Sequence, residues 1–489
     1  MVMTTNLARP AVSARAPMLP GDALFWHAEE AIPQVRLQVG GLLILDRAPD
    51  RNLLRASVQR WTASVPRLRQ RVVESPLWLG LPEWENDPHF DLDFHLRELV
   101  LPQPGSQRRL LDFAGSAVVT PLDHLRPPWE AYSIGGLEGG RAACLFKLHH
   151  SIVDGVGSMA LFEMLTQAGP ADAVCVPRLR ARRRELARAL RRPSVTEMAR
   201  SAAAAAFHPL RTAQQFLRTM GAFGGMIRDF NAHAIRDPLA DPDSDIGRRF
   251  DTLLLSLPRM QSIKNALGVT LNDLVLTAVA GAVGRYHEQH GVPVKELECM
   301  VPKNLRQAHD EVVGNRVGVF IVPLPVGEHD PLRRLRKIRS LTTAAKGTSH
   351  GSSSEFLLQA LAFVPGVAFR VFSQTMSGKI GLICTNLPGP RAQRYLAGAK
   401  VEAMYPFLPA MFGIPLTVAL LSYGDTYAVG IDTDGAAIKH PGLLCRYIED
   451  GVEEIARRAL HKSSPGLFPH HRPSVSRIPR REHERACHH

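Results

Sequence analysis

The sequence predicts an α/β or α+β protein with two domains, and three observations support this fold class. The chain has 489 residues, which is more than one hydrophobic core usually supports. Apolar runs typical of buried strands alternate with amphipathic helical stretches in both halves. A stretch rich in arginine and other helix-forming residues separates the halves. We therefore expect two α/β or α+β domains with a helical crossover between them.

Residues 18–170 are expected to form the N-terminal domain. Its strand-like runs are "VRLQVGGLLIL" and "AACLFKLHH", and its helical stretches are "RNLLRASVQRWTASV" and "MALFEMLTQA". Prolines interrupt residues 1–17, which lack the continuous apolar core of a signal peptide. This leading segment is expected to be flexible.

Residues 171–249 are expected to form a basic helical crossover. Its segment Arg178–Arg192 holds eight arginines and one glutamate, with leucine and alanine between them. Such a helix suits an anionic membrane surface, which attracts each basic residue by about 1 kcal/mol. The same charge run is also typical of a solvated helix face, and the sequence leaves both interpretations open.

Residues 250–462 are expected to form the C-terminal domain. A helix is predicted to open near Thr270 to Asp273 and to close at a glycine. The strand-like runs are "RVGVFIVPLPV", "GLICTNLPGP", "LTVALLSYGD" and "TYAVGIDTDG". Residues 463–489 are rich in Arg, His, Pro and Ser without apolar periodicity, so a disordered basic tail is expected there.

Charge and cysteine content exclude several classes of protein. The formal charge of +13 favours anionic partners, namely nucleic acid, acidic lipid or a phosphate-bearing molecule. Nucleic-acid binding is disfavoured, because the basic stretch lacks interleaved aromatics and no recognition motif is present. The six cysteines form no CxxC pair, which argues against a zinc ribbon or disulfide framework and predicts a reducing, cytosolic compartment. No apolar run reaches the roughly 18–20 residues that a bilayer requires.

A histidine pair at a strand end is the strongest candidate site. In "CLFKLHHSIVDGVGSM", His149 and His150 follow an apolar run, and an Asp-Gly turn comes next. Neighbouring side chains on a strand face opposite ways, so one histidine can be a general base and the other a packed support. Asp154 is placed to brace the turn, and Gly155 permits a close approach of other chain segments. Two opposed histidines without a third ligand predict no metal site.

"HHSIVDG" resembles the HHxxxDG motif of the acyltransferases related to chloramphenicol acetyltransferase and to peptide-synthetase condensation domains. The surrounding motifs narrow the resemblance to the bacterial wax ester synthase/diacylglycerol acyltransferase family. They are "LPGDALFW", "PRLRQRVV", "DPHFDLDFHLR", "TPLDHLRPPWE", "TLNDLVLTAVAGAV", "GNRVGVFIVPLP" and "TNLPGP".

This resemblance implies two chloramphenicol-acetyltransferase-like domains, with mixed sheets flanked by helices and an active-site tunnel between them. It implies transfer of a long-chain acyl group from acyl-CoA, a co-substrate, to diacylglycerol or a fatty alcohol, with no bound cofactor. His150 corresponds to the family's general base and His149 to its less critical neighbour, while Asp154 takes the motif's structural position. A cytoplasmic enzyme is expected, with peripheral contact to an anionic inner membrane face or lipid inclusions.

The Asn-Asp motif of the family matches Asn272 and Asp273. Asn272 is predicted either to donate to the oxyanion or orient the base, or to cap the helix that "TLND" suggests. Asp273, in the first helical turn, is predicted to give electrostatic or hydrogen-bonding support.

Two departures from the family pattern bear on substrate choice rather than chemistry. Its usual Pro-Leu-Trp reads Pro127-Pro128-Trp129 here, and Lys303 and Asn304 replace smaller residues. Two other functions stay open: a catalytically silent lipid-surface or scaffold protein of the same fold, and a superfamily acyltransferase with a different acceptor. Cys144 is expected to be a core residue rather than a nucleophile.

Overall fold

The computed structural model describes the chain in several ranges, namely residues 15–32, 35–74, 81–169, 236–240, 247–304, 314–315, 317–347, 370, 373–374, 377–408 and 413–460. The segment Arg178–Arg192, most of the predicted crossover and the predicted tail lie outside the described residues.

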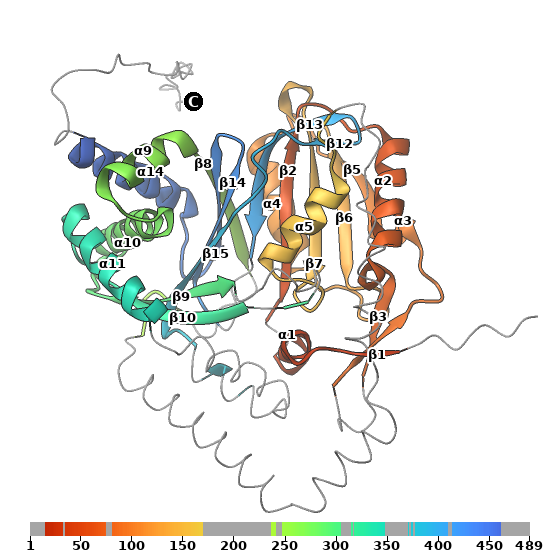
Figure 1. The fold of residues 1–489 in the computed structure, drawn as a ribbon, viewed down its shortest axis with the longest axis horizontal. Helices are drawn as coiled ribbons and strands as arrows, with labels where there is room; N and C mark the ends of the chain where they lie inside the picture. Colours follow the sequence, from red (N-terminus) through yellow and green to blue (C-terminus); the bar gives the residue numbers. More distant parts are fainter. Residues whose placement is uncertain are drawn as a thin grey trace, which may run out of the picture.

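The N-terminal half forms helices and strands where the sequence predicts them (Figure 1). Its strands are β1 (Ala16–Pro17), β2 (Gln38–Leu45), β3 (Gln70–Val73), β4 (Glu83–Asn86), β5 (Leu96–Val100), β6 (Trp129–Gly135) and β7 (Ala142–His149). Its helices are α1 (Pro20–Ala31), α2 (Arg51–Ser64), α3 (Leu92–His95), α4 (Gln107–Val119) and α5 (Gly155–Leu165).

The C-terminal half has a similar mixture of elements. Its strands are β8 (Arg248–Ser256), β9 (Leu297–Asn304), β10 (Val317–Leu324), β11 (Ile380–Leu387), β12 (Tyr395–Leu396), β13 (Ala399–Phe407), β14 (Leu416–Tyr423) and β15 (Thr426–Asp434). Its helices are α9 (Leu257–Leu267), α10 (Leu271–Gln289), α11 (Pro331–Gly347) and α14 (Pro441–Leu460).

Two six-stranded mixed sheets organise the described residues, which confirms the predicted fold class. The first has the order β12-β13-β2-β7-β6-β5 and the second the order β10-β9-β11-β14-β15-β8. Most neighbours are antiparallel, but β5 and β6 are parallel, as are β11 and each of its two neighbours. Strands β12 and β13 come from the C-terminal half yet pair in the first sheet, so the C-terminal half completes the sheet of the N-terminal half.

Three apolar cores hold the layers together. Helices α9, α10, α11 and α14 cover the outer face of the second sheet, as Figure 1 shows. A separate core joins the two sheets, with α4 packed against both β2 and β8. Within it, the rings of Phe250 and Phe407 stack with centroids 3.7 Å apart. An aromatic pair of this kind contributes about 0.5–1.5 kcal/mol beyond its buried area, so it helps to hold the two sheets together.

In the described part of the chain, no single helix is long and apolar enough to cross a bilayer. Helices α9 and α10 are long and apolar enough for a span only if they are taken together, and the chain bends by 101° between them.

Candidate active site

Strand β7 ends at the histidine pair and directs the two rings into different surroundings, as strand geometry predicts. All eight residues of β7 are buried between β2 and β6. The ring of His150 stacks on Phe25 of α1, with centroids 4.0 Å apart and planes 10° apart. The ring of His149 instead meets the next residue of α1, Trp26, edge to face at 5.2 Å. Only one of the two imidazoles can therefore serve a given cavity.

The two nitrogens of the His150 ring have different environments. Its Nδ1 lies 2.8 Å from Oδ1 of Asn315. Among the described residues, no hydrogen bond to its Nε2 is found. Nδ1 of His150 is thus anchored by Asn315, whereas Nε2 is not held by any described residue.

Burial keeps the His150 imidazole neutral. Burial lowers the pKa of His150 from its ordinary 6.5 to about 4, although the carboxylate of Asp154 acts in the opposite direction. A neutral ring presents a lone pair at physiological pH, as a general base requires. Because the folded-state pKa is the lower one, the unfolded chain binds more protons between pH 6.5 and about 4, so this histidine lowers folding stability as the pH falls through that range.

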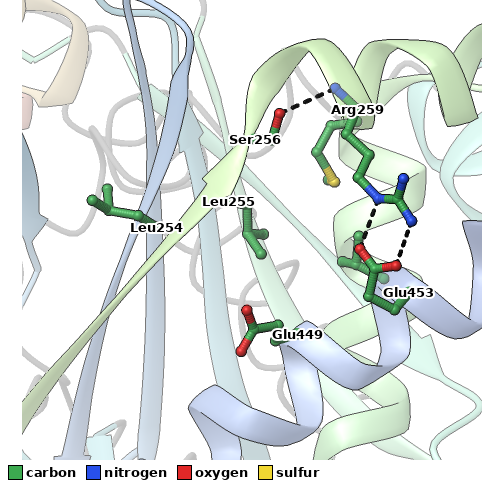
Figure 2. Close-up of a pocket in the computed structure, with 8 residues that line it drawn as sticks. Leu254, Leu255, Ser256, Arg259, Glu449 and Glu453 are labelled. Carbon is green, nitrogen blue, oxygen red and sulfur yellow. Dashed lines mark hydrogen bonds and ion pairs between the residues drawn. The ribbon is translucent and has the colours of Figure 1, made fainter. Parts of the chain in front are cut away.

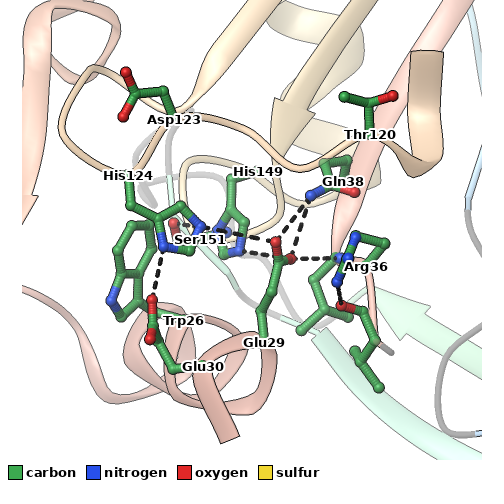
Figure 3. Close-up of polar contacts among 12 residues, drawn as sticks. Trp26, Glu29, Glu30, Arg36, Gln38, Thr120, Asp123, His124, His149 and Ser151 are labelled. Atoms are coloured by element: carbon green, nitrogen blue, oxygen red, sulfur yellow. Dashed lines mark hydrogen bonds and ion pairs between the residues drawn. The ribbon is translucent and has the colours of Figure 1, made fainter. Parts of the chain in front are cut away.

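His149 belongs to a buried polar network centred on Glu29 (Figure 3). One oxygen of Glu29 accepts the backbone N–H of Leu37 at 2.8 Å, and Gln38 donates to the other at 3.0 Å. Nε2 of His149 lies 3.3 Å from Glu29, an ion-pair distance without hydrogen-bond alignment. Its Nδ1 accepts the backbone N–H of Ser151 at 3.1 Å. This network holds the strand end against α1, which is a supporting role.

The Asp-Gly turn after the histidines is held by a helix cap and a close contact. Asp154 is buried and accepts the backbone N–H of Gly157 at 2.8 Å, capping α5. A Cβ on Gly155 would lie 2.8 Å from the side chain of Leu387, which belongs to the C-terminal half. A larger residue at position 155 would therefore push the halves apart at the site.

The Asn-Asp motif begins α10, but the capping residue is Thr270. The side chain of Thr270 accepts the backbone N–H of Asp273, and Asp273 accepts the backbone N–H of Thr270 in return. Asp273 also accepts a hydrogen bond from Thr342 at 2.8 Å, so it supports the helix start. The suggestion that Asn272 is the cap is wrong, because Thr270 occupies that position. Asn272 is half-buried in the first turn, and its catalytic role stays a prediction.

The departures from the family pattern have different surroundings. The carbonyl of Pro128 accepts the backbone N–H of His149 at 2.9 Å, so this substituted position touches the site. Trp129 is a core residue that donates to the Leu68 carbonyl. Lys303 is exposed on β9.

Cys144 is buried, and burial raises the pKa of its thiol to about 12, as expected of an unreactive core residue.

A cavity of about 180 Å³ lies away from the histidines, between β8, α9 and α14 (Figure 2). Arg259 and Glu453, which both line it, form an ion pair. None of the predicted site residues lines this cavity. It is therefore not the predicted acyl tunnel.

Sequence reasoning missed four residues around the histidines: Asp22, Phe25, Glu29 and Asn315. Asp22 and Phe25 lie within "LPGDALFW", and Asn315 lies within "GNRVGVFIVPLP", so both segments were noted only as family markers. The available signal for Asp22 and Glu29 was their spacing of seven positions, which places both on the same face of α1.

Comparison with known proteins identifies the family. The model described as "Wax ester synthase/diacylglycerol acyltransferase catalytic domain" matches residues 18–275, and "WS/DGAT C-terminal domain" matches residues 313–456. The O-acyltransferase WSD of Acinetobacter baylyi is 30% identical over 458 residues, covering 89% of this chain and 96% of its own.

Solved structures agree with this family. The wax ester synthase/diacylglycerol acyltransferase of Marinobacter aquaeolei VT8 matches with a TM-score of 0.63 and 26% identity, covering 91% of this chain and 99% of its own. A starter condensation domain of rhizomide synthetase, solved with C8-CoA, shares the fold at a TM-score of 0.58 and 12% identity, covering 90% and 94%. The chain therefore belongs to the wax ester synthase/diacylglycerol acyltransferase family, as its motifs predict.

Proposed function

We propose that this protein transfers a long-chain acyl group from acyl-CoA to a lipid alcohol, with His150 as the general base. The observation that carries the proposal is the asymmetry of the His150 ring, whose Nδ1 is anchored by Asn315 while no described residue forms a hydrogen bond with its Nε2. Membership of an O-acyltransferase family, and relatives named for acyl transfer to diacylglycerol or wax alcohols, support the substrate class.

The proposed reaction needs no nucleophilic side chain. Nε2 of His150 takes the proton of the alcohol, and the alcohol oxygen attacks the thioester carbon. The C–S bond then breaks, and the imidazolium returns the proton to the departing CoA thiolate. The free ring nitrogen and the neutral state of His150 fit both proton transfers. Asn272 is our candidate for a donor to the oxyanion that forms between these steps.

A direct assay tests both the activity and the acceptor. Purified protein is incubated with labelled palmitoyl-CoA and either hexadecanol or diacylglycerol, and the products are separated by thin-layer chromatography. We expect labelled wax ester, triacylglycerol or both, each dependent on the added alcohol. Release of free fatty acid alone, or no labelled lipid with either acceptor, would contradict the proposal and favour the silent lipid-surface protein.

A further inference from the structure

We propose that Asn315, held by Asp22, is a positioning residue that fixes the tautomer of His150. This inference rests on the proposed function, because it concerns how the base is prepared. Asn315 comes from the C-terminal half, 165 positions after His150 in the chain, yet the two side chains are hydrogen-bonded.

The contacts of Asn315 define which way its side-chain amide points. Its Nδ2 lies 2.8 Å from Oδ1 of Asp22 and 2.7 Å from the carbonyl oxygen of His150. Both of these atoms act as acceptors, so the NH2 group must face them. The amide oxygen of Asn315 consequently faces Nδ1 of His150, at 2.8 Å.

This orientation decides which ring nitrogen carries the proton. An amide oxygen only accepts, so Nδ1 of His150 must be the protonated nitrogen of the neutral ring. Nε2 is then the lone-pair nitrogen, and it is the one to which the proposed function assigns the proton of the alcohol. Without Asn315, the neutral ring could place its proton on Nε2 and lose its basic lone pair there.

Asp22 holds Asn315 in this orientation. The carboxyl of Asp22 is 1% exposed, and its Oδ1 accepts both the backbone and the side-chain N–H of Asn315 at 2.8 Å. Burial raises the pKa of Asp22 to about 6, but Oδ1 stays an acceptor in either state because a proton can occupy Oδ2. Asp22 therefore does not need its negative charge for this role, but it does need Oδ1 as an acceptor.

The same contact joins the two halves at the base. Gly314 forms a parallel bridge with Val153, and its N–H donates to the Ile152 carbonyl at 2.9 Å. Gly314 has a φ of +91°, which glycine adopts readily. The turn after His150 and the Gly314–Asn315 segment are thus hydrogen-bonded to each other. Asn315 can therefore fix the Nδ1-protonated tautomer of His150 only when the two halves are docked.

The first experiment compares Asn315→Leu with the matched control Asn265→Leu, which changes an exposed asparagine on α9. For Asn315→Leu we expect kcat to fall about ten- to a hundred-fold with the KM for palmitoyl-CoA unchanged, because a buried donor loses its partner and the base loses its orientation. The control should keep the wild-type kcat. Asp22→Ala should lower kcat in the same way, and Asp22→Asn should restore most of it.

The second experiment reads the tautomer directly in the wild-type protein and needs a variant only to assign the resonances. In wild-type protein labelled with ¹⁵N-histidine, the resonances lost in His150→Gln identify His150, and we expect its Nδ1 to be the protonated nitrogen. A proton on Nε2, or an Asn315→Leu enzyme with full kcat, would overturn the positioning role. An active His150→Ala enzyme would instead overturn the proposed function itself, so the two failures are distinguishable.

Discussion

Replacing His150 with alanine lowers the rate of acyl transfer by about a hundred- to ten-thousand-fold, the contribution that general acid–base catalysis typically makes. The reason is that Nδ1 of His150 is held by Asn315, so that we assign acceptance of the alcohol proton to Nε2. The measurement is the initial rate with labelled palmitoyl-CoA and the preferred acceptor, made on protein whose circular dichroism matches that of the wild type.

His149→Ala is the matched control for this substitution. Its ring is enclosed and contacts Glu29 and Ser151, so its loss should reduce stability more than it reduces turnover. A folded His150→Ala protein with unchanged activity would contradict the assignment of the base. Equal losses of activity in the two fully folded variants would show that His150 is not the general base with His149 as its structural support.

Replacing Glu29 with alanine is expected to lower the free energy of unfolding by about 3–5 kcal/mol, the usual cost of removing one partner from a buried charged network. Glu29 is 6% exposed, and its loss would leave the backbone N–H of Leu37 and the side chain of Gln38 unpaired. Urea denaturation followed by circular dichroism measures the change.

Glu30→Ala is the control for Glu29→Ala. Glu30 is the next residue of α1, but its carboxylate is 39% exposed and contacts only His124 among the described residues, so a change of about 1 kcal/mol or less is expected. Equal effects of the two substitutions would contradict the account of the network.

The pKa of Glu29 predicts how this contribution depends on pH. Burial alone would raise that pKa, but the nearby imidazoles of His124 and His149 and the hydrogen bond from the backbone of Leu37 hold it below its ordinary value. The stabilisation is therefore present above the ordinary pKa of about 4.5 and is lost as the pH falls through the lower folded-state value.

Local patterns in the sequence predicted the elements that depend on nearby residues. The apolar run before His149 is a buried strand, and the polar residues at 270–273 begin a helix, because strand burial and helix capping act over a few positions. The opposite directions of His149 and His150 follow from strand geometry for the same reason.

Features that join distant segments were not accessible in this way. No local pattern pairs Asn315 with His150, and none places β13 beside β2 in the first sheet. The capping residue at the start of α10 was also ambiguous, since Thr270, Asn272 and Asp273 all favour such positions. The reciprocal hydrogen bonds of the capping box between Thr270 and Asp273 distinguish them in the structure.

The dependence of kcat/KM on pH tests the central claim most directly, because its acid limb reports the pKa of the essential base in the free enzyme. Since burial lowers the pKa of His150 to about 4, activity should persist below pH 6.5 and decline only as the pH approaches that lower value. An acid limb at or above pH 6.5 would mean that the base is a solvated group, and would contradict a buried, neutral His150 as the residue that accepts the proton.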